Sequence, residues 1–199
     1  MESVLNEETL ESLALAWFSE LGYEVKFSPD IAPGEPGAER DSYEEVLLPG
    51  TLRVALERLN PHLPPEALDE VIRKLRRSDF ADLVMENRRL HRFITEGVPV
   101  EFRDRDGNIR HDYAKLVDFS TPENNDWLVL NQFTVIENRI NRRADVVVFL
   151  NGIPVALMEL KSPSDETAKL GSAFNQIETY KAQIPSLFRF NEVVVLSDG

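Results

Sequence analysis

Cysteine is absent from the 199 residues of this chain, which excludes a disulfide framework and a thiolate metal site. No apolar run approaches the roughly 18 residues that a membrane-crossing helix needs. The acidic N-terminal segment lacks the basic start and apolar core of a secretory signal. The pattern Gly-x-x-x-x-Gly-Lys-Ser/Thr is also missing, so these residues contain no phosphate-binding loop of this type for ATP. We therefore expect a soluble, cytoplasmic protein without a membrane partner.

Positive charge is scarce, and it is unevenly distributed. The net charge is −13, and residues 1–50 hold twelve acidic residues against two basic ones. This balance disfavours DNA binding, because affinity for a duplex comes largely from Lys and Arg side chains that neutralise phosphates. Residues 71–92 are the exception, with seven basic residues against three acidic ones. Two interpretations of this basic segment remain open: it contacts a phosphate backbone, or it is an ordinary solvated helix face.

Hydrophobic periodicity predicts helices in the first half of the chain. Asn6 is a candidate N-cap for a first helix that ends at Gly22, and a strand is expected at 23–27. A loop rich in Pro, Gly and acidic residues at 28–42 precedes helical patterns at about 50–59, 65–77 and 79–96. The predicted apolar stripe of the first helix is Leu10, Leu13, Ala14, Trp17, Phe18 and Leu21.

The second half of the chain changes to a β pattern. A hairpin is predicted around Asp106–Gly107, followed by strands at about 112–119, 127–137, 144–150 and 153–161. A helix at about 165–183 and a strand at 192–196 complete the pattern. These elements predict an α/β fold, with a mixed central β-sheet flanked by helices and a helical segment inserted at about 43–97. The predicted buried stripe of the last helix is Leu170, Ala173, Phe174, Ile177 and Ile184.

Three charged residues stand at the ends of two apolar strands that are joined by Asn151-Gly152. They are Asp145, Glu159 and Lys161, and charges in such places are costly unless they are paired or functional. Glu159 and Lys161 are two residues apart, so they share one face of a strand. Two carboxylates beside a lysine suit Mg²⁺, which prefers oxygen ligands and needs only one or two from protein. Alone, however, Glu-x-Lys is common in strands that have only a structural role.

The register of the hairpin tests this hypothesis. A plain two-residue loop at Asn151–Gly152 would pair Asp145 with Met158 and send Asp145 and Glu159 to opposite faces. The two carboxylates share a face only if the loop has three residues or if the ladder contains a bulge. A type I turn with a G1 bulge at Gly152 is one way to achieve this.

These residues match the PD-(D/E)xK nuclease signature, although Ala144 replaces the usual proline, which is not a ligand. The wider stretch from 131 to 199, including ADVVVFLNGIPVALMELKSP, resembles the N-terminal nuclease domain of the type I restriction enzyme R (restriction) subunit. The resemblance implies a restriction-endonuclease-like core and an Mg²⁺-dependent DNA endonuclease, in which Mn²⁺ can substitute. Asp145 and Glu159 would be the metal ligands, and Lys161 would complete the catalytic centre.

The resemblance also points to accessory residues. A glutamate on the first helix assists the metal site in this family, and Glu11 is the matching position, with Glu7 in reserve. For either glutamate, a solvated helix flank is the alternative. A Gln-x-x-x-Tyr element is matched by Gln176 and Tyr180, which share a helix face and could contact the DNA backbone or the catalytic lysine. A generic helix flank is the alternative for this pair.

Expected partners follow from the same resemblance: double-stranded DNA, and the methylation and specificity subunits of a type I restriction complex. Residues 1–199 would form a single nuclease domain, with its catalytic core at about 1–27 and 112–199, in a longer chain whose ATP-dependent translocase lies downstream. Three alternatives are another PD-(D/E)xK nuclease of resolvase or repair type, a catalytically inactive DNA-binding module of the same fold, and a scaffold that does not bind nucleic acid.

Overall fold

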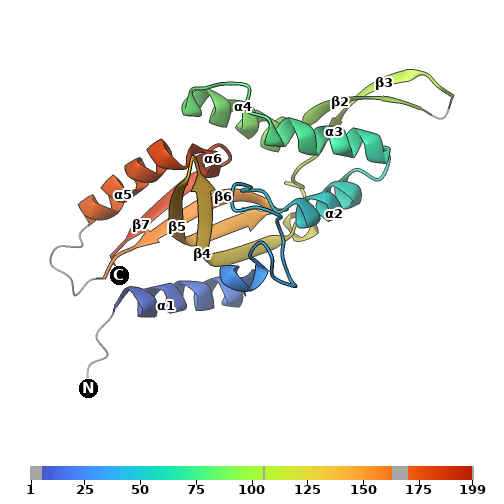
Figure 1. Ribbon diagram of the computed structural model, residues 1–199. Helices are drawn as coiled ribbons and strands as arrows, with labels where there is room; N and C mark the ends of the chain where they lie inside the picture. The colour runs from blue at the N-terminus through green and yellow to red at the C-terminus, as the bar shows by residue number, and fades with distance from the viewer. Residues whose placement is uncertain (1–5, 105, 163–169, 199) are drawn as a thin grey trace.

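The computed structural model describes residues 6–104, 106–162 and 170–198. Its centre is a mixed five-stranded sheet with the strand order β1-β4-β5-β6-β7, and helices lie on both of its faces (Figure 1). The predicted α/β class with a mixed central sheet is therefore confirmed. The strands of this sheet are β1 (Glu24–Phe27), β4 (Trp127–Glu137), β5 (Ile140–Leu150), β6 (Ile153–Leu160) and β7 (Val193–Ser197).

The middle of the sheet is an antiparallel meander of β4, β5 and β6, while β1 and β7 run parallel to their neighbours. Asn138 and Arg139 form the β4–β5 turn with φ values of 50° and 67°. Two positive φ angles give a hairpin turn whose twist matches that of the strands. β5 therefore begins at Ile140, earlier than predicted, because Ile140 and the polar residues 141–143 continue the ladder opposite β4.

Helix α1 (Glu7–Glu20) begins as predicted, where the Asn6 side chain accepts a hydrogen bond of 2.8 Å from the backbone N of Thr9. Gly22, with φ of +90°, follows its last turn. The side that packs on the sheet is narrower than the predicted stripe, because contact is centred on one small residue, Ala14. Correspondingly, the outer part of the predicted stripe is exposed, by 41% at Leu13, 64% at Trp17 and 73% at Leu21.

The connection from β1 to the inserted helices is held against the sheet by a buried arginine. This connection contains a short 3₁₀ helix, η1 (Ser28–Ile31). Arg40 donates to the backbone O of Glu45 at 2.7 Å and to the backbone O of Thr134 in β4 at 2.6 Å. Its guanidinium lies 4.0 Å from the centre of the Phe133 ring, and burial lowers its pKa to about 10.

Three helices form the inserted segment: α2 (Pro49–Leu59), α3 (Pro65–Arg76) and α4 (Leu83–Glu96). All three were predicted, but α4 starts later than the predicted position 79. The reason is its cap: the Asp82 side chain accepts from the backbone N of Met85 at 2.9 Å, so the helix begins after Asp82.

Polar contacts fasten α3 and α4 to the core. Arg189, just after the short helix α6 (Pro185–Phe188), donates to the backbone O of Leu75 at 3.0 Å and of Arg77 at 3.1 Å, where α3 ends. From α4, the Asn87 side chain donates to the backbone O of Asn191 at 2.9 Å, immediately before β7. The inserted helices and the last strand are thus tied to the same short connection.

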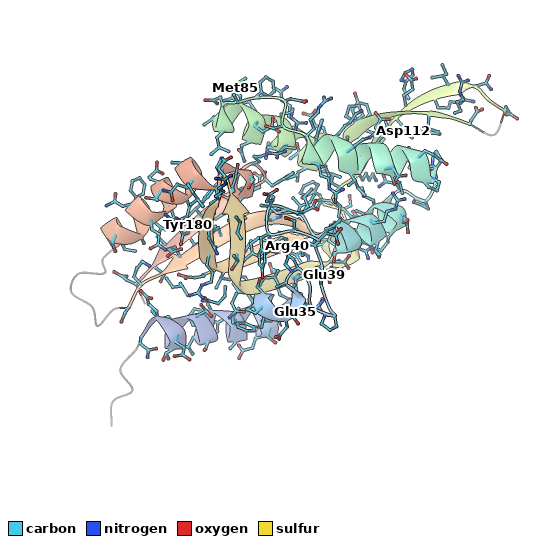
Figure 2. The ribbon with its side chains drawn as sticks, in the orientation of Figure 1. Glu35, Glu39, Arg40, Met85, Asp112 and Tyr180 are labelled. Carbon is cyan, nitrogen blue, oxygen red and sulfur yellow. The ribbon has the colours of Figure 1, made fainter. Side chains whose placement is uncertain are left out.

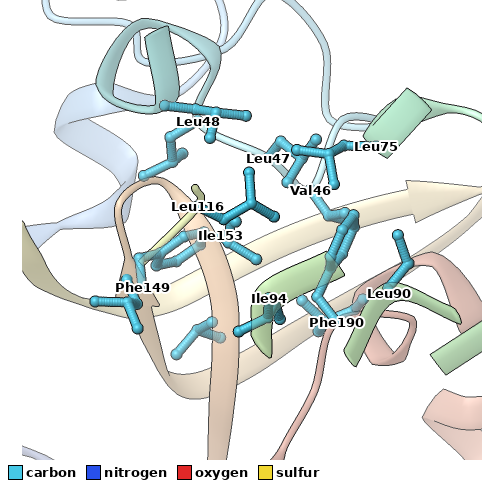
Figure 3. Close-up of a cluster of buried hydrophobic side chains, with 14 of the residues drawn as sticks. Val46, Leu47, Leu48, Leu75, Leu90, Ile94, Leu116, Phe149, Ile153 and Phe190 are labelled. Atoms are coloured by element: carbon cyan, nitrogen blue, oxygen red, sulfur yellow. The ribbon is translucent and has the colours of Figure 1, made fainter. Parts of the chain in front are cut away.

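Apolar packing has the same effect, because the insertion and the sheet share one hydrophobic core. Leu75 of α3 and Leu90 of α4 lie in the same buried cluster as Phe149, Ile153 and Phe190 (Figure 3). All five side chains are almost completely buried.

A separate antiparallel ribbon, β2 (Val98–Arg103) and β3 (Ile109–Ala114), extends away from the body of the molecule (Figure 1). The predicted hairpin at 106–107 is confirmed, with Gly107 at φ of +82°. The strand predicted at 112–119 is wrong in extent: β3 begins at Ile109 and ends at Ala114. Beyond it, the Asp118 side chain accepts from the backbone N of Thr121, which forms a turn before η2 (Pro122–Asn124).

No helix in the described ranges has both the length and the apolar character to cross a membrane.

Candidate active site

The β5–β6 hairpin turns at Asn151 and Gly152, with φ values of 53° and 80°. Leu150 pairs with Ile153, so the loop has two residues and both have positive φ. The G1-bulge geometry that we considered for this turn is therefore wrong. Buried Asn151 fixes the turn by donating to the backbone O of Leu116 at 2.8 Å and accepting from the backbone N of Asp126 at 2.8 Å.

A bulge further along the hairpin restores the shared face. Phe149 pairs with Pro154, but the next residue, Val148, pairs with Ala156, so Val155 is an extra residue on β6. Proline fits here, because it cannot donate to a ladder and is found at bulges. Past the bulge Val146 pairs with Met158, and the same offset sets Asp145 opposite Glu159. The bulged ladder, one of the two predicted possibilities, therefore puts both carboxylates on one face.

The two opposed carboxyl groups are in contact, and both are largely shielded from solvent. Asp145 Oδ2 accepts from the backbone N of Leu160 at 2.8 Å, and Glu159 is completely buried. Burial and, next to it, the charge of Asp145 raise the pKa of Glu159 to about 7. Burial also raises the pKa of Asp145, and Glu11 and Glu7 add to this rise with their charges. The pair is under electrostatic stress that a cation would relieve.

Lys161 is the nearest positive charge in the described part of the site. Its Nζ lies 3.0 Å from Glu159 Oε1 and 3.8 Å from Glu7 Oε1, and the side chain is only 12% exposed. Burial acts to lower the pKa of Lys161, but the hydrogen bond and charge of Glu159 outweigh it and raise this pKa. One lysine faces four carboxylates, those of residues 7, 11, 145 and 159, so the site has an excess of negative charge.

The two glutamates of α1 reach the site in different ways. Glu11 accepts from the side-chain amides of Asn131, at 2.7 Å, and of Gln132, both on β4. Glu7 instead approaches Lys161. Sequence reasoning missed the two amides. Gln132 has a φ of +57° and forms no ladder pair with β5, although the residues on both sides of it do. Nothing in the local sequence indicates this irregularity.

Helix α5 (Leu170–Gln183) presents Gln176 and Tyr180 to β5. Gln176 Nε2 donates to the Tyr180 hydroxyl at 2.7 Å, and that hydroxyl donates to the backbone O of Arg143 at 3.0 Å, two residues before Asp145. Burial raises the pKa of Tyr180, which faces the sheet (Figure 2). Tyr180, predicted at the edge of the buried stripe, is thus buried together with the predicted stripe residues Ala173, Ile177 and Ile184, while Gln176 is half-buried. Of that predicted stripe, Leu170 and Phe174 are exposed, by 45% and 54%, because α5 turns Tyr180 toward the sheet.

The donor set fits a hard divalent cation. Glu159 Oε2 is buried and has no hydrogen-bond partner among the described residues, although its neighbour Oε1 is paired with Lys161. Such an orphaned oxygen is costly in a folded protein, and a metal ion would satisfy it. No group of three or more Asp, Glu, His or Cys suited to a metal occurs in the described ranges. Two carboxylates are nonetheless sufficient for Mg²⁺, which keeps several waters.

The raised pKa of Glu159 predicts how the stability of the metal-free chain depends on pH. Between its unfolded value of 4.5 and its folded value of about 7, the folded state holds a proton that the unfolded state has released. Stability therefore falls as pH rises through this window, by about 3 kcal/mol from this residue. In urea unfolding with a chelator present, the free energy of unfolding of wild type should fall by about this amount relative to that of Glu159→Gln between pH 4.5 and pH 7.5.

The reference variant controls for the other carboxyl groups, which titrate in both proteins. Parallel curves for the two proteins from pH 4.5 to 7.5 would mean that Glu159 titrates normally and that the site is not strained. Adding Mn²⁺ should stabilise wild type more at pH 7.5 than at pH 5.5, because metal ligands must be deprotonated.

A mixed five-stranded sheet flanked by helices, with two opposed carboxylates and a lysine on its central hairpin, is consistent with a restriction-endonuclease-like fold. Residues 4–199 match the family described as type I restriction enzyme R protein N terminus. The chain therefore belongs to this family.

Two relatives are similar to almost the whole chain. It is 36% identical over 197 residues to the type I restriction enzyme HindI endonuclease subunit of Haemophilus influenzae. It is 36% identical over 200 residues to the putative type I restriction enzyme MjaIXP endonuclease subunit of Methanocaldococcus jannaschii. Each alignment covers 98% of this chain but only 19% of the relative, so the chain spans about a fifth of the length of these proteins.

Proposed function

We propose that this chain is the Mg²⁺-dependent endonuclease domain of a type I restriction enzyme R subunit and that it hydrolyses phosphodiester bonds of DNA. The observation that carries the proposal is the opposed pair Asp145–Glu159 with Lys161 beside it, in which one buried carboxylate oxygen has no hydrogen-bond partner within the described part of the chain. Membership of the R-protein family favours this function over a resolvase or repair nuclease.

Each residue has a role that follows from its position. Asp145 and Glu159 hold the cation, for which Mn²⁺ can substitute. When bound, this cation activates water and neutralises charge on the scissile phosphate. Lys161 positions the attacking water or stabilises the negative charge that develops on the phosphate. Glu11 orients and polarises the site from α1.

Gln176 and Tyr180 act as accessory residues. Their hydrogen-bonded pair fixes the backbone of β5 two residues before Asp145, through the carbonyl group of Arg143. A rigid support of this kind keeps a metal ligand in its productive orientation.

The partners of the proposed domain are double-stranded DNA and the methylation and specificity subunits of a type I complex, in the cytoplasm. ATP is used only by a translocase further along the same polypeptide. The relatives are endonuclease subunits about five times as long as this chain, which leaves room for such a motor.

The experiment that tests the proposal separates Lys161 from the two carboxylates. In Lys161→Ala, cleavage by the assembled enzyme should fall by at least about 10²-fold, the effect of removing one stabilising group from a transition state. Mn²⁺ affinity, measured on this chain by isothermal titration calorimetry, should stay the same or rise, because a nearby positive charge repels the cation.

Lys181→Ala is the matched control, since Lys181 is a half-exposed lysine on α5 whose ion pair among the described residues is with Glu178 at 2.8 Å. It should leave both quantities unchanged. Normal cleavage in Lys161→Ala would contradict the catalytic assignment. Intact metal binding without cleavage in the wild-type assembled enzyme would point instead to an inactive DNA-binding module.

A further inference from the structure

A groove outside the catalytic centre lies between α4 and the β2–β3 ribbon, with a volume of about 370 Å³. Its walls include Met85, Arg88 and Arg92 on α4, Phe80 in the loop before it, and Tyr113 on β3. Met85 is labelled on α4 in Figure 2. A volume of this size matches those of pockets that bind small ligands, so the groove has room for one or two nucleotide units.

Two arginines in this groove have no ion-pair partner among the described residues. Arg88 and Arg92 are exposed, and neither guanidinium forms an ion pair or a hydrogen bond with a described residue. Arg89, which also lines the groove, is committed to buried Glu86 at 2.5 Å. Of the two acids in the lining, Asp79 is paired with Arg77 and Arg89, and Glu96 is the other.

Large apolar side chains are exposed beside these arginines. Tyr113 is 60% exposed, Phe80 is 44% exposed and Met85 is 43% exposed. Exposed rings next to free guanidinium groups are the two elements with which proteins hold unpaired nucleotides: bases stack on aromatic faces, and cations contact the phosphates. In a duplex the bases are already stacked on each other, so these rings would have no base face to contact.

We propose that this groove binds a short single-stranded segment of DNA, with a base against Tyr113 or Phe80 and its phosphates on Arg88 and Arg92. The inference rests on the proposed function for the identity of the substrate, and it adds a site on that substrate away from the cleavage centre. Under this proposal the two interpretations of the basic segment apply to different residues: Arg76, Arg77 and Arg89 form ion pairs within the fold, while Arg88 and Arg92 are available to bind.

The test measures fluorescence anisotropy of a labelled six-nucleotide oligothymidylate with the whole chain, in a chelator so that no cleavage can occur. The double variant Arg88→Gln/Arg92→Gln should bind at least about tenfold more weakly, and the slope of log affinity against log salt should fall by about 1.4. Tyr113→Ala should weaken binding about fivefold or more through lost stacking. Arg73→Gln is the matched control, because Arg73 is exposed on α3, its guanidinium forms no ion pair or hydrogen bond with a described residue, and it lies outside the groove.

Each other outcome overturns the proposal. No binding by wild type, or equal weakening by Arg73→Gln, would mean that the groove is not a site for DNA. Equal affinity for a duplex of the same length, or equal competition by a polyglutamate peptide of the same charge, would mean that the groove does not select unpaired bases. The readout is independent of catalysis, because binding is measured without a divalent cation, and absence of cleavage by the wild-type enzyme would count only against the proposed function.

Discussion

Cleavage by the assembled enzyme should fall by at least about 10³-fold when Asp145 is replaced by alanine, because a metal ion contributes several kcal/mol of stabilisation to a phosphoryl-transfer transition state. Asp145 and Glu159 are opposed on the hairpin and are the two metal ligands of the proposed site, so the loss of Asp145 would leave that site with one of them. Mn²⁺ affinity should fall together with cleavage, unlike in Lys161→Ala. Both quantities are measured on the same preparations, by an assay of plasmid linearisation and by calorimetry.

Asp106→Ala is the matched control, since Asp106 is an exposed carboxylate at the tip of the β2–β3 ribbon. This variant should cleave and bind Mn²⁺ as wild type does. ATP hydrolysis and DNA translocation by the assembled enzyme should survive Asp145→Ala, because the proposal assigns them to another part of the polypeptide. Persistent cleavage in Asp145→Ala would show that the nuclease site lies elsewhere.

Gly152→Ala should be one of the most damaging single substitutions for the fold. Gly152 has a φ of +80°, and an added Cβ would lie 2.7 Å from the backbone O of Leu48 and 2.8 Å from the backbone N of Leu52. The left-handed conformation costs a residue with a Cβ about 1–2 kcal/mol, and crowding adds about 1–3 kcal/mol. The free energy of unfolding, measured in urea, should therefore fall by about 2–5 kcal/mol.

Gly22→Ala separates the two costs. Gly22 has a similar φ of +90°, but nothing lies within 4 Å of an added Cβ. It should lose only the conformational part. Equal free energies of unfolding for Gly152→Ala and Gly22→Ala would contradict the close packing of α2 on the hairpin turn. Since this turn starts the register that leads to Asp145, Gly152→Ala should also weaken Mn²⁺ binding.

Local sequence signals were sufficient where one residue determines the backbone. Asn6 begins α1, and the pair Asn151-Gly152 forms the β5–β6 turn, because these residue types accept the cap and the positive φ angles that the positions require. The apolar strand 146–150 was equally clear, since its burial on both faces leaves a continuous hydrophobic run.

The burial of several other side chains depends on tertiary contacts that the local sequence does not indicate. Trp17 fits the apolar stripe of α1 but is exposed, because the position of the helix on the sheet depends on Ala14 and on contacts with β4. Tyr180 was predicted at a helix edge, yet it is buried, because the carbonyl of Arg143 gives its hydroxyl a partner. Both outcomes depend on residues far away in the sequence.

The candidate site lies between these two cases. Asp145, Glu159 and Lys161 were identified from the sequence, but whether the carboxylates meet depended on the bulge at Val155. Pro154, within a central strand, is a sequence signal for such a bulge that the prediction did not use. Glu11 was chosen by resemblance, and its amide partners on β4 became visible only in the folded chain.

The bulge at Val155 compensates for one extra residue between the turn and the charged residues of β6. Side chains alternate between faces at every step, so a regular ladder that paired Val155 would set Met158 opposite Asp145 and turn Glu159 and Lys161 away from it. Deleting Val155 would instead remove the bulge and leave Glu159 opposite Asp145. For this hairpin, therefore, a shorter strand keeps the two carboxylates together, whereas a more regular pairing of the same residues separates them.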